Sequence, residues 1–368
     1  MRGTGDVRMD SSKRDGSRPR RLAPDANFYE LYDESEVLDI ASSLDLYRTI
    51  PLQYGYFGGG AQHWSDYVQR MADQDLPNTL VRTQQLLDIN FAFLQELIAP
   101  HGRINIVDIG PGDCSPVKGL LARLQEEELL GRYIALDTSR AMREIAAKNI
   151  HTWFGGAIGF EGHRIDMTRE SFRHVIRSQA VVGEQHRINV ALLLGGTLYN
   201  FREPEAVLTK IRQSLSPGDL LVHVVKIDSP RTRQFFDFNT VAEMNAPLSR
   251  DHRLVLESLG ISPDLYDLEN GYDPADRRRY IRVRLRESVE LFFTTGVGDR
   301  VVSLAVGEPI HLWHYWHHDQ LQVREQLVRG GFYPLLLCEY PDHDYLLCIC
   351  RVEAGREASS QSIGPAFT

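Results

Sequence analysis

The chain has 368 residues, of which 42% are hydrophobic and 25% charged, and its formal net charge is −9. This length accommodates about two domains, and the composition is that of a folded globular protein rather than a disordered one. The acidic balance argues against a general nucleic-acid binder, because phosphate contacts require clustered lysine and arginine. No run approaches the ~18 apolar residues that a membrane helix needs, so we expect neither a nucleic-acid nor a membrane partner.

Both ends of the chain differ from its middle. The first 22 residues carry seven basic against three acidic side chains and have no apolar segment of the kind found in secretory signals. We expect disordered tails at residues 1–24 and 354–368, with a basic nucleic-acid arm as the alternative for the first. The spacing of the four cysteines fits neither a disulfide framework nor a metal site, which favours a reduced, cytoplasmic setting. They are Cys114, Cys338, Cys348 and Cys350.

Helices and strands then follow in a regular order. Apolar residues recur at helical spacing within residues 80–97, so residues 25–100 are expected to form an N-terminal helical cap. From residue 101 strands alternate with helices as far as residue 228, which is typical of a parallel, helix-covered sheet. The expected strands are residues 104–109, 133–137, a run ending at Asp166, 187–194 and 220–227.

The alternation stops between residues 229 and 320, a mixed stretch rich in Arg, Asp and Tyr. It resumes with a helix at 321–328 and ends with two strand-like runs, 333–339 and 345–352, which predict a terminal β-hairpin. We therefore expect one Rossmann-like domain formed by residues 101–228 and 321–353. Residues 229–320 would be a substrate-binding lobe inserted into it.

A glycine-rich turn follows the first expected strand. In the segment Val107–Ser115, Gly110 and Gly112 let a ligand approach the backbone at the carboxyl end of the sheet. A dinucleotide fingerprint requires a third glycine where Ser115 stands. Asp108, just before the first glycine, suits a ligand that presents an ammonium group, such as the methionyl end of S-adenosylmethionine (SAM). A nicotinamide site and a turn without a ligand are the alternatives.

Carboxylates at the ends of the next strands favour the same cofactor. Asp137 ends the second strand and is placed to accept from two ribose hydroxyls. Asp166 ends the third and can accept from the adenine amino group, with Met167 packing on the ring. Gly195, after the fourth strand, is a further expected contact. Together these positions predict SAM as the cofactor, and helix-capping roles for the aspartates are the alternative.

The segment Leu192–Phe201 (LLLGGTLYNF) and the Pro-Gly-Asp turn at 217–219 resemble the histidine-specific, ergothioneine-type SAM-dependent methyltransferases. The resemblance implies a class I SAM-methyltransferase fold, an α/β Rossmann-like sheet with a terminal β-hairpin and an inserted α+β lobe. Further stretches similar to this family, in consistent order, are Tyr56–Ala61 with Trp64, Phe238–Asn245, Arg282–Arg286 and Gly307–Ile310.

The resemblance also implies roles for individual residues. Asn200 matches the family's substrate-binding asparagine beside the donor methyl, and we expect Tyr199 and Tyr56 to help position the acceptor. Leu76 stands where the family has a substrate tyrosine, and Trp313 stands where it has a glutamate that binds the amino acid. We expect Trp313 and Tyr315 to form a wall of the substrate pocket.

Histidines surround these two aromatic residues. The pattern His311, His314, His317, His318 raises the possibility of a metal site, but a strand presents alternate residues on one face, and this spacing does not fit, so we expect no metal. Alternation would place His311 and His317 on the face of Trp313 and Tyr315. The basic run Arg277–Arg279 is interpreted as a solvated face, with carboxylate binding as the alternative.

These observations predict a SAM-dependent methyltransferase that acts on a small amino-acid-like acceptor. N-methylation in natural-product biosynthesis is the expected reaction. Transfer or cyclisation of the 3-amino-3-carboxypropyl group of SAM is one alternative, and a non-catalytic SAM-binding partner protein is another. The sequence leaves the oligomeric state and the identity of the acceptor open.

Overall fold

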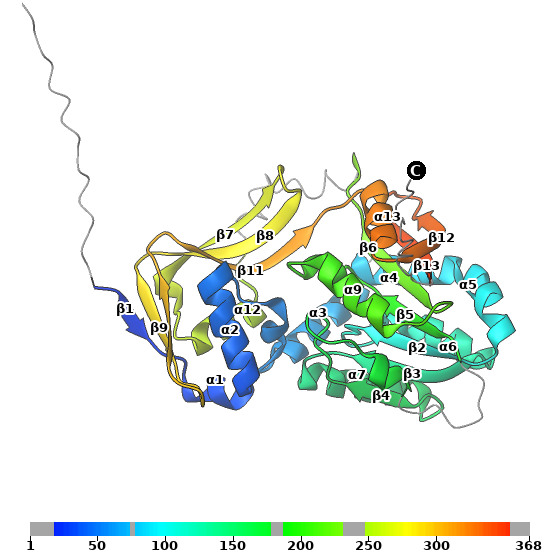
Figure 1. Ribbon diagram of the computed structural model, residues 1–368, viewed down its shortest axis with the longest axis horizontal. Helices are drawn as coiled ribbons and strands as arrows, with labels where there is room; N and C mark the ends of the chain where they lie inside the picture. The colour runs from blue at the N-terminus through cyan, green and yellow to red at the C-terminus, as the bar shows by residue number, and fades with distance from the viewer. Residues whose placement is uncertain (1–17, 74–77, 178–186, 231–246, 354–368) are drawn as a thin grey trace, which may run out of the picture.

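The computed structural model describes residues 18–73, 78–177, 187–230 and 247–353, which form two lobes side by side (Figure 1). One lobe is built on a seven-stranded sheet in the order β12-β13-β6-β5-β2-β3-β4. All of its strands are parallel except β13, which is antiparallel to both of its neighbours. The expected Rossmann-like sheet with a terminal hairpin is confirmed. Its strands are β2 (Ile104–Ile109), β3 (Leu130–Leu136), β4 (Phe160–His163), β5 (Asn189–Leu193), β6 (Leu220–Lys226), β12 (Phe332–Glu339) and β13 (Tyr345–Val352).

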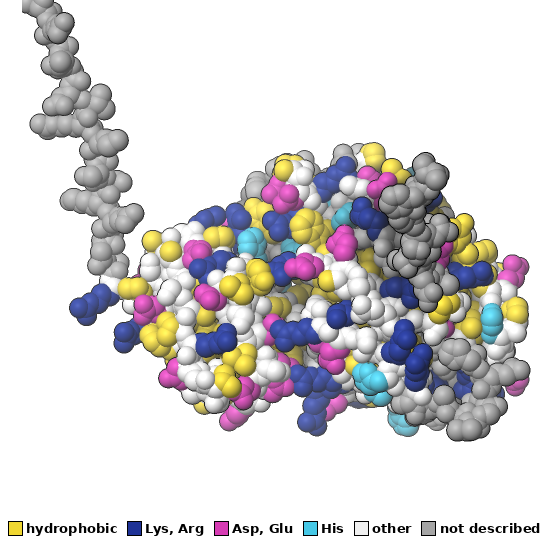
Figure 2. Space-filling model, in the orientation of Figure 1, with side chains coloured by type: hydrophobic (Ala, Val, Ile, Leu, Met, Phe, Trp, Pro, Cys, Tyr) yellow, Lys and Arg dark blue, Asp and Glu magenta, His cyan; other side chains and the backbone are white. Residues whose placement is uncertain are grey.

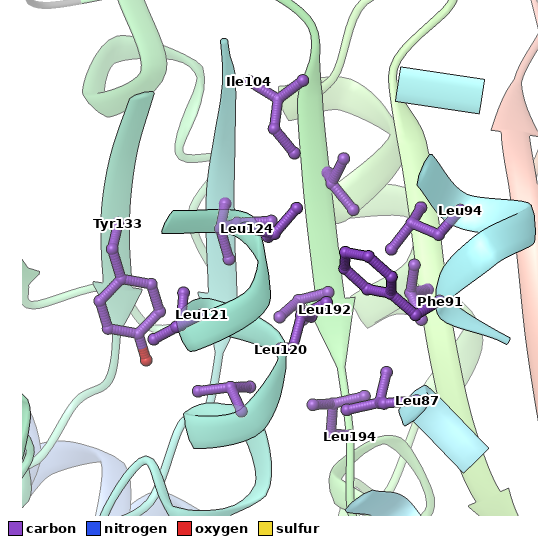
Figure 3. Packing of buried hydrophobic residues seen from close by; sticks show 14 of the residues in the cluster. Leu87, Phe91, Leu94, Ile104, Leu120, Leu121, Leu124, Tyr133, Leu192 and Leu194 are labelled. Atoms are coloured by element: carbon purple, nitrogen blue, oxygen red, sulfur yellow. The ribbon is translucent and has the colours of Figure 1, made fainter. Parts of the chain in front are cut away.

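Helices cover both faces of this sheet. Every residue of β2 and of β5 is buried, because successive side chains enter the two hydrophobic cores in turn. One core receives Leu121 of a helix and Phe91 and Leu94 of another, as Figure 3 shows. The helices of that face are α4 (Thr79–Ile89), α5 (Phe91–Ile98), α6 (Lys118–Glu126) and α7 (Arg140–Phe154). Those of the other face are α8 (Arg173–Arg177), α9 (Pro204–Ser214) and α13 (Gln320–Arg329).

The second lobe contains two three-stranded sheets, in the orders β1-β9-β10 and β11-β8-β7. Its strands are β1 (Arg20–Leu22), β7 (Tyr266–Asp273), β8 (Arg278–Leu285), β9 (Val289–Phe293), β10 (Arg300–Leu304) and β11 (Pro309–Trp316). Its helices are α1 (Ala26–Leu31), α2 (Glu34–Tyr47) and α12 (Arg250–Ser258). The expected insertion with both helices and strands is therefore confirmed, and it shares a hydrophobic core with the N-terminal residues.

The N-terminal segment is organised differently from the expected single cap. Phe28, Ile40 and Tyr54 pack with the inserted strands, whereas Leu86 and Phe91 pack on the central sheet. The expected disorder as far as residue 24 is wrong at its end, because Arg20–Leu22 form β1 and pair in parallel with β9. The rest of that tail to residue 17, and the C-terminal tail from 354, lie outside the described residues.

Between the lobes lies α3 (Gly60–Ala72), as Figure 1 shows. The 3-10 helix η1 (Leu52–Tyr56) contacts α3 and α12. Asp33 begins α2 with a capping box to Glu36, and Ser139 caps α7 through its hydroxyl, so polar side chains fix helix starts on both sides of this boundary. The remaining 3-10 helices are η2 (Ala99–His101), η3 (Ser115–Val117), η4 (Thr197–Asn200) and η5 (Pro263–Leu265).

Charges of both signs are interspersed over the face shown in Figure 2, including the boundary between the lobes. Within the described ranges, no helix has the length and apolar character that crossing a membrane requires.

Candidate cofactor and acceptor site

The glycine loop after β2 adopts the open conformation that its sequence predicts. Gly110 has φ +63° and Gly112 has φ +58°, a left-handed region that side chains disfavour. A Cβ atom on Gly110 would lie 3.0 Å from Cγ2 of Thr197, at the start of η4. The loop therefore brings bare backbone to the carboxyl end of the sheet, where an extended ligand can lie on it.

Asp108 lies beneath this loop and is only 2% exposed. Its Oδ2 accepts a hydrogen bond of 2.9 Å from the hydroxyl of Tyr133, which also lies 3.1 Å from the sulfur of Cys114. Burial raises the pKa of Asp108 to about 7, and the charge of Asp137 contributes to this rise, whereas the Tyr133 hydrogen bond opposes it. A cationic ligand group here would stabilise the charged carboxylate.

Asp137 follows β3 directly, as expected. Its Oδ1 accepts a 2.8 Å hydrogen bond from the backbone N–H of Ser139, which fixes the carboxylate at the start of α7. Burial raises the pKa of Asp137 to about 6. The structure thus places the two predicted carboxylates, Asp108 and Asp137, near each other at the ends of adjacent strands.

Tyr56 and Trp64 come from the segment between the lobes and cover the cofactor loop. The hydroxyl of Ser139 donates to the carbonyl oxygen of Tyr56 at 3.2 Å. Burial raises the pKa of Tyr56, and the charges of Asp251 and Asp137 add to this rise. Trp64 stands edge-on to Tyr56 with ring centroids 5.9 Å apart, and its Nε1 is 3.3 Å from where a Cβ on Gly112 would be.

Asp166 and Met167 follow β4, which ends earlier than expected, at His163. The Asp166 carboxylate accepts hydrogen bonds from the backbone N–H and the hydroxyl of Thr168, at 2.9 and 2.6 Å, and thereby caps a turn. Met167 is buried in the adjoining hydrophobic core. Their contacts with adenine stay a prediction.

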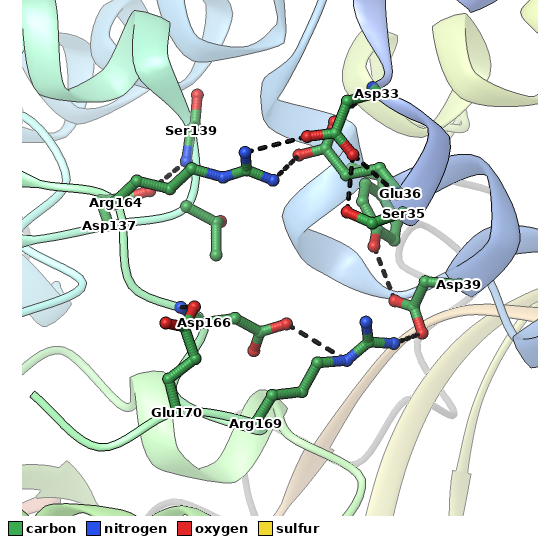
Figure 4. A network of polar contacts seen from close by, with 12 residues as sticks. Asp33, Ser35, Glu36, Asp39, Asp137, Ser139, Arg164, Asp166, Arg169 and Glu170 are labelled. Atoms are coloured by element: carbon green, nitrogen blue, oxygen red, sulfur yellow. Dashed lines mark hydrogen bonds and ion pairs between the residues drawn. The ribbon is translucent and has the colours of Figure 1, made fainter.

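Ion pairs hold this loop against the other lobe (Figure 4). Arg169 pairs with Asp166 at 3.6 Å and with Asp39 of α2. The hydroxyl of Tyr54 donates to the same Asp39 at 2.6 Å. Arg164 likewise reaches α2, with 2.9 Å to Asp33 and 3.0 Å to Glu36. We call these seven side chains the interlobe network: Asp33, Glu36, Asp39, Tyr54, Arg164, Asp166 and Arg169.

The loop after β5 brings Asn200 to the boundary between the lobes. Gly195 and Gly196 have φ +69° and +84°, and a Cβ on Gly196 would lie 2.8 Å from the Tyr315 ring. Tyr315 can pack here only because residue 196 lacks a side chain. The Oδ1 atom of Asn200, at the end of η4, is buried without a hydrogen-bond partner among the residues that the structure describes.

Tyr199 occupies a different place from the expected one beside the acceptor. Its side chain is fully buried, and its hydroxyl donates to Oε1 of Gln326 in α13 at 2.9 Å. Its ring stacks on His318 with 4.7 Å between centroids. These contacts assign Tyr199 a packing role between η4 and α13, because its hydroxyl is engaged in the core.

Trp313 and Tyr315 lie on one face of β11, with ring centroids 6.2 Å apart and planes 22° apart. A bulge between His311 and Trp313 shifts the register with β8. His311 pairs with Arg282 and His314 with Tyr280, so both lie on the opposite face. The expectation that His311 shares a face with Trp313 is therefore wrong, because a bulge interrupts the two-residue alternation.

Burial shifts the histidines near β11 toward their neutral form. Burial lowers the pKa of His311 and of His317 to about 4, and also lowers the pKa values of His314 and His318. In the described part of the chain, no group of three or more His, Cys, Asp or Glu side chains is arranged to hold a metal ion.

Several site residues were missed by reasoning from the sequence. Trp64 was noted only for its resemblance to a family segment, and Tyr133 only as part of a strand. Arg279, interpreted as solvated, extends its guanidinium over Trp313, with 5.4 Å from Cζ to the ring centroid. Tyr280, which directly follows the basic run, is the aromatic residue in the sequence that could have pointed to this contact. The expectations for Leu76 and for Phe238–Asn245 lie outside the described residues.

A family model described as histidine-specific methyltransferase, SAM-dependent, matches residues 38–352. A histidine N-alpha-methyltransferase of Mycolicibacterium smegmatis is 29% identical over 175 residues, 43% of this chain and 51% of that protein. The chain thus aligns with about half the length of this curated relative.

Solved structures resemble the chain at low sequence identity. Magnesium protoporphyrin IX methyltransferase from Synechocystis, with bound S-adenosylhomocysteine (SAH), matches with a TM-score of 0.44 and 10% identity, over 86% of this chain and 99% of that one. A SAM-dependent methyltransferase from Clostridium acetobutylicum matches with a TM-score of 0.40 and 9% identity, over 80% of this chain and 99% of that one.

Proposed function

Because the chain belongs to the histidine-specific, SAM-dependent methyltransferase family, we propose that it methylates the amine of a small amino-acid-like acceptor. The name of the relative from M. smegmatis, histidine N-alpha-methyltransferase, supports an α-amine as the modified position. We also propose that the product is an intermediate of natural-product biosynthesis. Biosynthetic genes next to the gene for this protein would support this role.

The main observation behind this proposal is that Oδ1 of Asn200 is buried without a hydrogen-bond donor among the described residues. A buried acceptor without a hydrogen bond costs about 1–3 kcal/mol, and no described residue satisfies this one. Asn200 ends η4, which packs against both the glycine loop and β11. An acceptor amine at this point would donate to Oδ1, which would orient its lone pair toward the cofactor loop.

The residues of the cofactor half fit SAM. Asp108 would hold the ammonium group, and Asp137 would accept from the ribose hydroxyls, while the glycine loop leaves room for the chain between them. When bound, SAM supplies a methyl group that its sulfonium already activates for displacement. The protein has to align the acceptor and exclude water, which Tyr56 and Trp64 do by covering the loop.

In the reaction, the neutral amine nitrogen forms its bond to the methyl carbon as the carbon–sulfur bond breaks, and SAH is released. The proton of the methylated ammonium then leaves to solvent. Asn200 accepts one N–H of the amine through Oδ1 and therefore restricts the direction of attack. Its contribution is geometric, since an amide does not remove protons at neutral pH.

Mass spectrometry of the protein incubated with SAM and a panel of amino acids tests this proposal. We expect SAH together with an acceptor heavier by one methyl group, and a loss of kcat of at least tenfold in Asn200→Ala with little change in SAM affinity. Methylthioadenosine as the product would instead support aminocarboxypropyl transfer or cyclisation. Tight SAM binding without turnover would support a non-catalytic SAM-binding protein.

A further inference from the structure

The 3-10 helix that carries Asn200 has little rigidity of its own. η4 is four residues long, and the hydrogen bonds of a 3-10 helix have poorer geometry than those of an α-helix. It follows Gly195 and Gly196, whose φ values of +69° and +84° lie in the region that glycine adopts without strain. The direction of the Asn200 amide therefore depends on how η4 packs against the rest of the domain.

Tyr199 supplies this packing. It directly precedes Asn200, and its fully buried ring stacks on His318 with 4.7 Å between centroids. It also stands edge-on to Tyr315 at 6.0 Å, and Tyr315 packs over Gly196. Neighbouring side chains of a 3-10 helix project about 120° apart, because the helix has three residues per turn. A rotation of η4 that moves Asn200 must therefore also move Tyr199 out of these contacts.

The hydroxyl of Tyr199 extends this packing to two further helices. It donates to Oε1 of Gln326 at 2.9 Å, and Nε2 of Gln326 donates to Oε1 of Glu205 at 2.8 Å. Gln326 belongs to α13 and is 2% exposed, whereas Glu205 lies in the first turn of α9, where the helix dipole favours a carboxylate. Because the carboxylate accepts and the amide N–H donates, the amide oxygen of Gln326 must face Tyr199. We call Tyr199, Gln326 and Glu205 the Tyr199 anchor.

We propose that the Tyr199 anchor sets the direction in which Asn200 presents Oδ1, which makes Tyr199 and Gln326 positioning residues of the transfer reaction. The inference rests on the proposed function, in which Oδ1 of Asn200 accepts from the amine of the acceptor. A misplacement of about 1 Å at a reacting centre can lower a rate by about a hundredfold, so even a small shift of η4 is measurable.

Two substitutions remove the hydrogen bonds of the anchor and keep most of its volume, Tyr199→Phe and Gln326→Met. We expect each to lower kcat about fivefold, measured as SAH release with the most active amino acid of the panel, while calorimetry shows SAM affinity within about twofold of wild type. Ser214→Ala is the matched control, because Ser214 accepts a buried hydrogen bond from the Phe172 N–H at the other end of α9. It should lower stability and leave kcat unchanged.

A double-mutant cycle separates positioning from a general loss of stability. In the Asn200→Ala background, Tyr199→Phe should have no further effect on kcat, because the anchor acts through Asn200. The same loss of kcat in both backgrounds, or wild-type kcat in both Tyr199→Phe and Gln326→Met, would overturn the inference. Wild-type kcat in Asn200→Ala would instead contradict the proposed function, so the two failures are distinguishable.

A spectroscopic readout makes the test independent of turnover. The side-chain amide signal of Asn200 in the NMR spectrum of the isotope-labelled protein is the one that Asn200→Ala removes. We expect Tyr199→Phe to shift or broaden this signal and Ser214→Ala to leave it in place. An unchanged Asn200 signal in a folded Tyr199→Phe protein would contradict the inference.

Discussion

The two halves of the site are assembled in different ways. The proposed cofactor half takes its residues from the ends of successive parallel strands, with the glycine loop after β2 and Asp137 after β3. The acceptor half combines α3 with β7, β8 and β11, which are separated by almost 200 residues along the chain. A parallel sheet converts chain order into spatial order, whereas the acceptor half exists only once two lobes have packed together.

The halves also differ in charge. Two buried carboxylates with raised pKa values, Asp108 and Asp137, mark the cofactor half, which suits a cationic ligand. Ring surfaces, among them Trp64, Trp313 and Tyr315, predominate in the proposed acceptor half. Each half therefore favours one partner of the reaction, and a mutation in one half should leave affinity for the other partner nearly intact.

The largest loss of SAM affinity should come from Gly110→Ala. A side chain at φ +63° costs about 1–2 kcal/mol, and the new methyl would meet Thr197 and the cofactor path. We expect calorimetry to show at least a hundredfold weaker SAM binding. Gly155→Ala is the control, since Gly155 has φ +55° in the left-handed region but open space around it. Equal SAM affinity in the two variants would contradict the site.

Next in size should be Asp108→Asn, with opposite effects on binding and on stability. The pKa of Asp108 is about 7 in the folded protein and about 3.9 in an unfolded chain, so at pH 8 its charge opposes folding. We expect the variant without ligand to gain on the order of 2 kcal/mol at pH 8 in denaturant unfolding, and to bind SAM at least tenfold more weakly. Unchanged stability together with unchanged SAM affinity would show that the charge of Asp108 neither opposes folding nor binds the cofactor.

A smaller, graded effect is expected from pH. Asp108 binds an ammonium group only when deprotonated, so SAM affinity should fall as pH drops below about 7, and more steeply below about 6 as Asp137 also becomes protonated. Titrations between pH 5.5 and 8.5 would measure this, with Tyr133→Phe shifting the curve to higher pH because it removes a stabilising hydrogen bond. A flat profile would contradict the assignment of the ammonium to Asp108.

The smallest effect should come from the interlobe network. Arg169 is 51% exposed, so its pair with Asp39 is worth less than about 1 kcal/mol of stability. The Arg169→Gln and Asp39→Asn variants should nevertheless raise KM for SAM severalfold, because the pair fixes the loop that carries Asp166. A double-mutant cycle of the two substitutions measures this coupling. Arg140→Gln, which breaks an exposed pair with Glu144 on α7, is the matched control and should change nothing.

The order of strands and of their terminal carboxylates was predictable because it depends on local patterns. The glycine loop follows β2, a short and fully buried apolar run, and Asp137 lies two residues before the N-cap Ser139 of α7. The bulge beside Trp313 was not predictable, since an extra residue leaves the apolar pattern of a strand intact and only the register with β8 reveals it.

The sequence also did not show which lobe each buried helix face packs against. The apolar residues of α2 and of α4 have similar helical spacing, yet α2 packs on the inserted strands and α4 on the central sheet. Tyr199 is a second example. Its hydroxyl donates to Gln326, more than 120 residues away in the chain, although the adjacent Asn200 lies at the proposed site. Periodicity shows that a face is buried but not what covers it.

Calorimetric titration of SAM into the wild-type protein and into Asp137→Ala tests the central claim most directly. The claim is that carboxylates at the ends of β2 and β3 hold the cofactor. We expect one SAM per chain in the wild type and at least tenfold weaker binding in the variant, with the unfolding transition otherwise retained. Equal SAM affinity in the two proteins would contradict the account.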